Sequence, residues 1–236
     1  MWESLGLLSF GADGWGDELA HGLKITVLLA VCTLPFGLAI GLLVALAKNS
    51  NERSLVIAAN VYTTIFRGLP ELLTLFIVYY GGQIALQKLI GLFSDVYVEV
   101  NGFVAGMIAL GLVFSAFSSE TFLSAFRGIP KGQPEAAKAL GLSSFQRFRL
   151  VVFPQLVRLA LPGLSNLWLV LLKETSLVSI IALDDLIRKT HLAVGNTKEP
   201  LLFYSVACGI YLIIALISSK GLNAIELKVN RGQERI

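Results

Sequence analysis

Long apolar runs alternate with short polar stretches along this chain. Five of the runs are near or above the roughly 20 residues that a helix needs to cross a hydrocarbon core of roughly 30 Å. The predicted membrane spans are 19–47, 54–81, 102–126, 151–172 and 201–222. The pattern therefore predicts an all-α polytopic membrane protein with five transmembrane helices.

The second apolar run is interrupted near its middle by the sequence FRGLPE. Arg67, Gly68, Pro70 and Glu71 place a charge, a glycine, a proline and a second charge within five positions. Backbone groups that a break sets free at membrane depth must be satisfied by protein or by a watery cavity. We therefore expect a discontinuous helix that lines a cavity.

The charged residues inside the predicted spans are candidates for contact with a solute, because an ionisable group at bilayer depth costs about 2.5 to 3.5 kcal/mol and normally faces a partner or a cavity. Arg67 and Glu71 are four residues apart, so in a continuous helix they would share a face. They could form an internal ion pair or line a pathway for a charged solute. Glu120, near the inner end of 102–126, could line the same pathway or extend toward the membrane surface.

The stretch 130–150 is the longest sparsely hydrophobic run within the membrane region. Pro134 suits a first helical position, the residues after it favour helix, and Gly141 can adopt the left-handed conformation that ends it. Ser143 and Gln146 have the spacing of a capping box for a new helix. A helix of about two turns is marginal alone, so it must pack against its own membrane domain or against a partner.

Composition and charge agree with a membrane location. Hydrophobic residues make up 55% of the chain, charged residues only 15%, and the mean hydropathy is +0.74. The segment 1–18 has no Lys or Arg, so we expect a permanent first span rather than a cleaved signal. Lys and Arg concentrate in three regions: the turn after the first span, residues 127–149, and the tail 223–236 together with the end of the last span. This distribution predicts a periplasmic amino terminus and a cytoplasmic carboxyl terminus.

Catalytic and metal chemistry find no support in the residue pattern. His21 and His191 are far apart, and Cys32 and Cys208 lie within apolar spans without ligand spacing. The sequence also contains no phosphate-binding loop of the G-x-x-x-x-G-K-[ST] type. We therefore expect no catalytic residue, metal or cofactor in this chain, and any ATP would be bound by another chain.

Several motifs resemble the permease subunits of ABC importers. The EAA loop of that family corresponds here to Glu135, Ala136, Ala137 and Gly141, followed by Leu161 and Pro162. The order of further motifs is similar to the polar amino acid permeases of the histidine, arginine and opine branch: FRGLPELLTLFIVYYG, SSETF, IPKGQPEAAKALGLS and LPGLSNLWLVLLKETSLVSI. The resemblance implies the type I ABC importer permease fold, with 130–150 as a loop that carries a short cytoplasmic coupling helix.

The resemblance also implies a function and partners. Such permeases lie in the bacterial inner membrane and work with a second homologous permease or a second copy, two ATPase subunits that bind ATP and Mg, and a periplasmic solute-binding protein, and with no nucleic acid. Their EAA helix docks on the ATPase. Glu71 resembles the acid of the branch for cationic amino acids, whereas Ser118 and Ser119 depart from the usual residues before the Glu of the third span.

Two other classes of function compete with this reading. A self-sufficient secondary carrier or channel would also explain charges within the membrane and a broken helix, but it would not explain an exposed EAA helix. An intramembrane enzyme would need a nucleophile with a base, or a metal pair, and the sequence offers neither. The sequence leaves open which amino acid or opine is carried.

Overall fold

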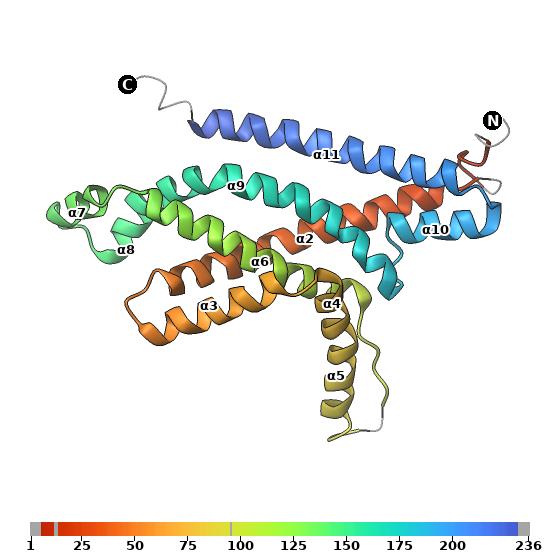
Figure 1. The fold of residues 1–236 in the computed structure, drawn as a ribbon, viewed down its shortest axis with the longest axis horizontal. Helices are drawn as coiled ribbons and strands as arrows, with labels where there is room; N and C mark the ends of the chain where they lie inside the picture. Colours follow the sequence, from red (N-terminus) through yellow and green to blue (C-terminus); the bar gives the residue numbers. More distant parts are fainter. Residues whose placement is uncertain (1–5, 12–13, 95, 231–236) are drawn as a thin grey trace. The chain divides into compact units, whose positions relative to one another are not determined.

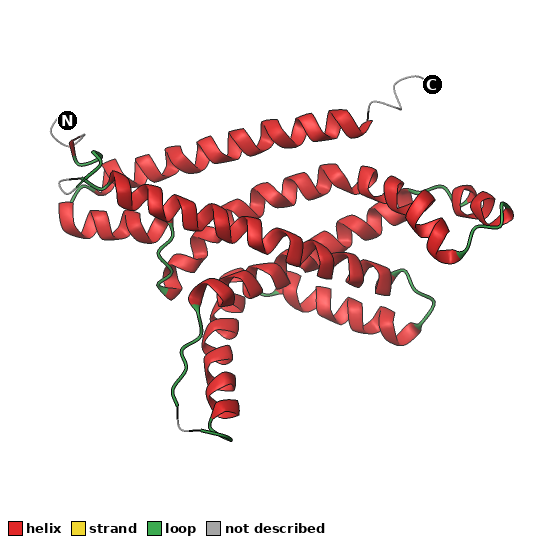
Figure 2. Ribbon diagram, turned by 180° about the vertical axis from the view of Figure 1, so that it is seen from behind, coloured by secondary structure: helices red, strands yellow, loops and turns green. Residues whose placement is uncertain are grey.

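The computed structural model describes residues 6–11, 14–94 and 96–230, and every regular element among them is a helix (Figure 2). These residues form two compact units. Unit 1 comprises 1–36, 69–111 and 170–217, and unit 2 comprises 37–68, 112–169 and 218–236. The all-helical class predicted from the sequence is thus confirmed.

Unit 1 gathers the elements around the broken helix and the last two helices. Its elements are the first part of α2 (Gly16–Lys48), α4 (Glu71–Phe76), η1 (Ile77–Gly81), α5 (Gly82–Ile90), the first part of α6 (Gly102–Gly128), the end of α9 (Phe153–Glu174), η3 (Thr175–Ile181), α10 (Leu186–Thr197) and most of α11 (Pro200–Asn230). One core cluster joins α2, α10 and α11 through Leu19, Leu186, Ala193 and Phe203.

Unit 2 holds the polar loop and the helices that flank it. Its elements are the rest of α2, α3 (Arg53–Gly68), the rest of α6, α7 (Gly132–Ala139), α8 (Ser144–Arg147), η2 (Phe148–Val152), most of α9 and the end of α11. Its core joins α2, α6 and α9 through Ala45, Phe122, Ala125, Ile129, Leu156 and Ala160.

The helix break expected at FRGLPE is present. α3 ends at Gly68 and α4 begins at Glu71. Pro70 has no N–H to donate, and its ring disfavours helical backbone at the residue before it, so the chain leaves the helix at this point. The carbonyl of Pro70 then accepts the N–H groups of Leu73 and Thr74, which starts the new helix.

Among the residues that the structure describes, five stretches are long and apolar enough to cross a membrane: Gly16–Lys48, Glu71–Ile90, Gly102–Gly128, Ser144–Ile181 and Pro200–Asn230. The number agrees with the sequence, but the second span does not. The single span expected at 54–81 is divided, because the break leaves α3 as a separate helix and the apolar stretch continues through η1 into α5. The predicted tail is helical to Asn230, while 1–5 and 231–236 lie outside the described residues.

The polar loop has the turns that the sequence predicts. Gly141 is left-handed with φ of 78°, and the N–H of Leu142 bonds to the carbonyl of Ala137, which closes the end of α7. The Ser143 hydroxyl accepts the N–H of Gln146 while the Gln146 side chain accepts the N–H of Ser143, so the capping box is confirmed. One detail was wrong: α7 starts at Gly132, which places Pro134 third in the helix, where its missing N–H is also harmless.

Two glutamines hold an extended segment against α5. Gln83 and Gln87 are one helical turn apart, and their side-chain amides bond to the backbone of Val96, Val98 and Val100. Each amide donates to one carbonyl and accepts one N–H, as a neighbouring strand would. The segment therefore runs beside α5 although no sheet is formed there (Figure 1).

Phe203 gives a direct test of the core of unit 1, because its side chain is fully buried. We expect Phe203→Ala to lower the free energy of unfolding by about 3 to 5 kcal/mol, since the cavity left among α2, α10 and α11 cannot close. Leu201→Ala is the matched control, because Leu201 is 81% exposed on the same helix. Thermal unfolding of the full chain in lipid nanodiscs measures both, and equal effects would contradict this core.

Candidate functional site

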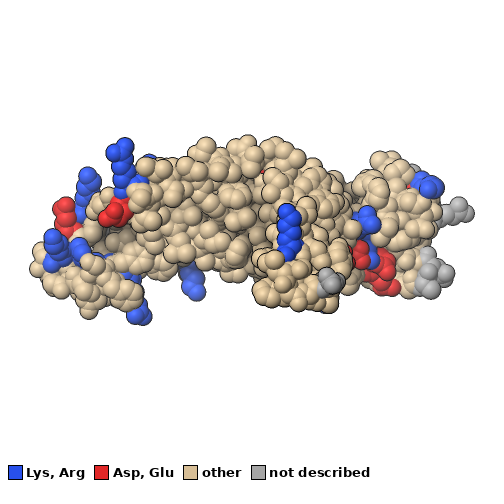
Figure 3. All heavy atoms as spheres, turned by 90° about the horizontal axis from the view of Figure 1, so that it is seen from below, with Lys and Arg blue, Asp and Glu red and all other residues tan. Residues whose placement is uncertain are grey.

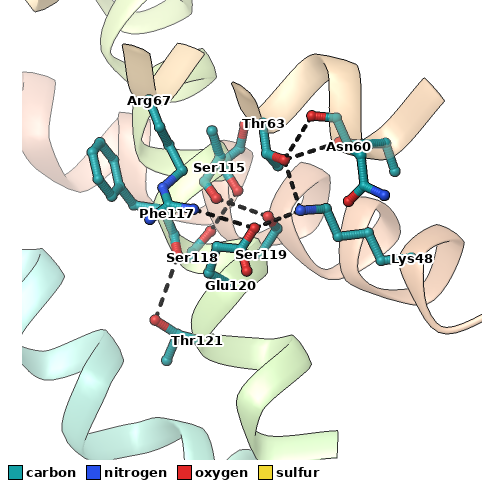
Figure 4. A network of polar contacts seen from close by, with 12 residues as sticks. Lys48, Asn60, Thr63, Arg67, Ser115, Phe117, Ser118, Ser119, Glu120 and Thr121 are labelled. Carbon is teal, nitrogen blue, oxygen red and sulfur yellow. Dashed lines mark hydrogen bonds and ion pairs between the residues drawn. The ribbon is translucent and has the colours of Figure 1, made fainter. Parts of the chain in front are cut away.

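Glu120 is the centre of a charged network in unit 2 (Figure 4). Its Oε1 lies 2.5 Å from Nζ of Lys48 on α2 and 3.4 Å from a guanidinium nitrogen of Arg67 on α3. Arg67 also lies over the ring of Phe117, with 5.5 Å between the guanidinium carbon and the ring centroid. One carboxylate on α6 therefore holds α2 and α3 through two cations.

The burial of these three side chains differs. The Lys48 side chain is 5% exposed and also donates to the Thr63 hydroxyl at 2.6 Å, so its ammonium depends on protein partners. Arg67 is 45% exposed and Glu120 is 34% exposed. Because two cations share one carboxylate, the network carries a net positive charge, and Arg67 is the cation that remains accessible.

Ser118 and Ser119, which depart from the family pattern, are fully buried in unit 2. Ser118 donates to the carbonyls of Ser115 and Gly37, and Ser119 donates to the carbonyl of Ala116. Both hydroxyls are used within α6 and at its contact with α2. They act in helix packing, and Glu120 is the charged side chain of the SSETF motif that reaches other helices.

Glu71 finds its partner in unit 1 rather than at Arg67. Its carboxyl group lies near the carboxyl group of Glu174, at the end of α9, and the charge of Lys173 also acts on Glu174. Both side chains are partly buried, and Lys173 beside Glu174 is exposed. The sequence left two possibilities for Arg67 and Glu71, contact with each other or with solute, and the structure gives each a separate carboxyl partner.

The sequence leaves the role of Glu174 open. At the end of a predicted span, extension of Lys173 and Glu174 toward the membrane surface explains these residues about as well as a function does. Its proximity to Glu71 depends on α4 packing against η3. A contact across about 100 residues of sequence has no periodicity that would have disclosed it.

The α7 helix has one packed face and one exposed face. Ala137 is buried where α7 contacts α8 and η2, whereas Glu135 and Ala136 are exposed. Leu140, at the end of the helix, is 81% exposed. Lys and Arg side chains gather around this part of unit 2 (Figure 3). The helix is therefore supported by its own unit and still offers a surface with an exposed leucine.

No cluster of three His, Cys, Asp or Glu side chains able to hold a metal ion occurs among residues 6–11, 14–94 and 96–230. Cys32 is half-buried and Cys208 is exposed, and both are free thiols.

Comparison with known proteins gives the family. Residues 37–225 match the model of the binding-protein-dependent transport system inner membrane component. The nopaline transport system permease protein NocQ of Agrobacterium fabrum is 42% identical over 97% of this chain and 98% of its own length. The histidine/lysine/arginine/ornithine transport system permease protein HisQ of Salmonella typhimurium is 38% identical over 94% of this chain and 97% of its own.

Solved structures agree with the sequence relatives. An amino acid ABC transporter crystallised with histidines matches with a TM-score of 0.77 and 29% identity, covering 91% of this chain and 95% of that one. The methionine ABC transporter MetNI in an inward-facing conformation matches with a TM-score of 0.73 at 17% identity, which supports the fold. The chain thus belongs to the family of binding-protein-dependent transport system inner membrane components, as a permease subunit of an ABC importer.

Proposed function

We propose that this permease carries cationic amino acids, or opines derived from them, across the bacterial inner membrane. The printed names of its relatives support this substrate class, because they include permeases for nopaline, octopine and the basic amino acids histidine, lysine, arginine and ornithine. The proposed orientation has the amino terminus in the periplasm and the α7 loop in the cytoplasm, as the distribution of Lys and Arg favours.

The observation that carries this proposal is the pair of carboxyl groups formed by Glu71 and Glu174. Two neighbouring carboxyl groups repel each other when both are ionised, so a shared proton or a cation between them is favourable. A guanidinium or ammonium side chain is such a cation, and a guanidinium can donate to two carboxylates at once. The break at Gly68 and Pro70 places Glu71 at the first position of α4, where it can face Glu174.

Arg67 and Glu120 take a different part in the proposed mechanism. Arg67 pairs with Glu120 and lies over the ring of Phe117, so we assign this pair to holding α3 against α6. Of the residues that the sequence placed on the pathway, Glu71 is the one for which we propose direct contact with the solute. Gly68 and Pro70 act by positioning it.

The coupling part of the proposal concerns α7. Glu135, Ala136 and Leu140 form an exposed surface for a separate ATPase subunit, while Ala137 fixes the helix to its own unit. Because η2 and α9 continue directly from the α7–α8 loop, a displacement of α7 is transmitted to α9. The proposed assembly has a second permease, two ATPase subunits that bind ATP and Mg, and a periplasmic binding protein that delivers the solute.

Glu71→Gln and Glu174→Gln test the carboxyl pair. We expect each to reduce uptake of a basic amino acid by the assembled complex about 10- to 100-fold, since a hydrogen bond to a charged group contributes about 1.5 to 3 kcal/mol. Uptake of radiolabelled arginine and histidine into proteoliposomes, driven by ATP, measures the effect.

Glu99→Gln is the matched control, because Glu99 is an exposed acid in the same unit. It should leave uptake unchanged. Normal uptake by both Glu71→Gln and Glu174→Gln would sink the proposed role of the pair, and uptake driven by an ion gradient without ATP would replace the importer with a secondary carrier.

Gly141→Pro tests the coupling role of α7. Proline holds φ near −65°, so it cannot adopt the left-handed conformation of Gly141, and the turn that presents the helix is lost. We expect ATP-driven uptake to fall to background while the chain still inserts into the membrane and folds. Gly132→Ala, at an uncrowded position with ordinary backbone in the same helix, should transport normally, and full activity of Gly141→Pro would refute the coupling role.

A further inference from the structure

Unit 1 contains a buried polar junction that the transport proposal does not use. Thr26 of α2, Thr175 of η3 and Asp185 before α10 have no exposed surface. Tyr211 of α11 completes the junction, with the hydroxyls of Thr175 and Thr26 as its near polar neighbours. Four elements of unit 1 therefore meet around one carboxyl group and three hydroxyl groups.

α2 holds the start of α10 through three positions spaced four residues apart, which share one face of the helix. Glu18 bonds to Lys189 at 2.8 Å, and Thr26 accepts the N–H of Leu186 at 3.1 Å. Between them, a Cβ added at Gly22 would lie 2.7 Å from the carbonyl oxygen of Asp185, so α2 and this loop are in direct backbone contact. Asp185 is thus fixed in place and shielded from solvent.

Two polar atoms of this junction have no hydrogen-bond partner among the residues that the structure describes. Asp185 caps α10 by accepting the N–H of Arg188 at 2.8 Å through Oδ1, but its Oδ2 has no partner. The Tyr211 hydroxyl is the other buried atom without one. A buried carboxylate oxygen that accepts no hydrogen bond is costly, whereas a neutral carboxyl group can donate its proton to a hydroxyl oxygen.

We propose that this junction is a proton-binding site, in which the carboxyl group of Asp185 holds a proton and donates it toward the hydroxyl oxygen of Tyr211. Binding of the proton removes the buried charge and satisfies both unpartnered atoms. It locks α10 onto α2 and α11, and its loss loosens α10. The site is separate from Glu71 and Glu174 and does not depend on the proposed substrate.

The charged groups around Asp185 agree with this assignment. Burial raises the pKa of Asp185 to about 6, the backbone N–H groups of Arg188 and Ile187 oppose the rise, and the charge of Asp184 adds to it. The nearby cation, Lys189, is taken by Glu18 and Asp184. Those hydrogen bonds raise the pKa of Lys189, so it stays charged where Asp185 titrates. The groups that α2 and η3 present to the junction are uncharged threonines, and Tyr211 faces it from α11.

The sign of the pH dependence follows from the raised pKa. The folded unit binds the proton more tightly than the unfolded chain, whose carboxyl group has the ordinary pKa of 3.8. The stabilisation is therefore present at acid pH and is lost as the pH rises from 3.8 through about 6. Two pKa units correspond to about a hundredfold in the equilibrium between locked and open α10.

Hydrogen exchange of the α10 amides in the full chain, in lipid nanodiscs, measures this equilibrium. After correction for intrinsic exchange, we expect protection of α10 to fall about 30-fold between pH 4.5 and pH 7.5, because a carboxyl group with a pKa of about 6 changes from mostly protonated to ionised over this range. Asp185→Asn should stay protected at both pH values, because the amide keeps the cap and supplies a permanent donor. Asp184→Asn, a change at the exposed neighbour, should keep the pH dependence.

Tyr211→Phe provides the second variant. It removes the acceptor, so the loss of protection should occur at lower pH, a shift that a purely structural role of Asp185 would not give. The proposal is overturned if Asp185→Asn keeps the pH profile of the unaltered chain, or if Tyr211→Phe leaves the midpoint pH of the loss of protection unchanged. It is also overturned if sodium chloride, but not choline chloride, protects α10 at pH 7.5, because a metal cation would then occupy the site in place of the proton.

Discussion

The helix break at Pro70 is the constraint on which the charge arrangement depends. Proline cannot donate the N–H that a continuous helix requires, so α3 ends at Gly68 and α4 begins at Glu71. Without the break, Arg67 and Glu71 would be neighbours on one helix face and would neutralise each other. With it, Arg67 pairs with Glu120 in unit 2, and Glu71 meets Glu174 in unit 1. One backbone feature thereby separates the ion pair of Arg67 and Glu120 from the pair of acids for which we propose contact with the solute.

Buried and partly buried charges in this chain are arranged in groups with different roles. Lys48, almost fully buried, requires Glu120, and the same carboxylate holds Arg67. Among the residues that the structure describes, neither Glu71 nor Glu174 forms an ion pair of that kind, which agrees with the proposal that their cation arrives with the solute. Asp185 solves the same problem by a third route, because a proton rather than a cation removes its charge. The roles of these three groups differ because the acids in each group lie beside different partners.

Local features were predictable from the sequence, whereas contacts between distant helices were not. The Ser143 and Gln146 capping box, the left-handed Gly141 and the break at Pro70 depend on a few neighbouring residues, and all three are present. Glu120 with Lys48, and Glu71 with Glu174, depend on how helices pack, which neither hydropathy nor the i, i+4 spacing encodes. The same limitation explains the second span: hydropathy merged α3 with α4 because a window cannot register where a helix stops.

The central claim, that the break gives Arg67 and Glu71 separate partners, is tested most directly by double-mutant cycles on thermal unfolding of the full chain. We expect Arg67→Gln and Glu120→Gln to show a coupling free energy on the order of 1 kcal/mol, because the two side chains form one ion pair. Arg67→Gln and Glu71→Gln should be additive within about 0.3 to 0.5 kcal/mol. Strong coupling between Arg67 and Glu71, with none between Arg67 and Glu120, would contradict this account of the broken helix.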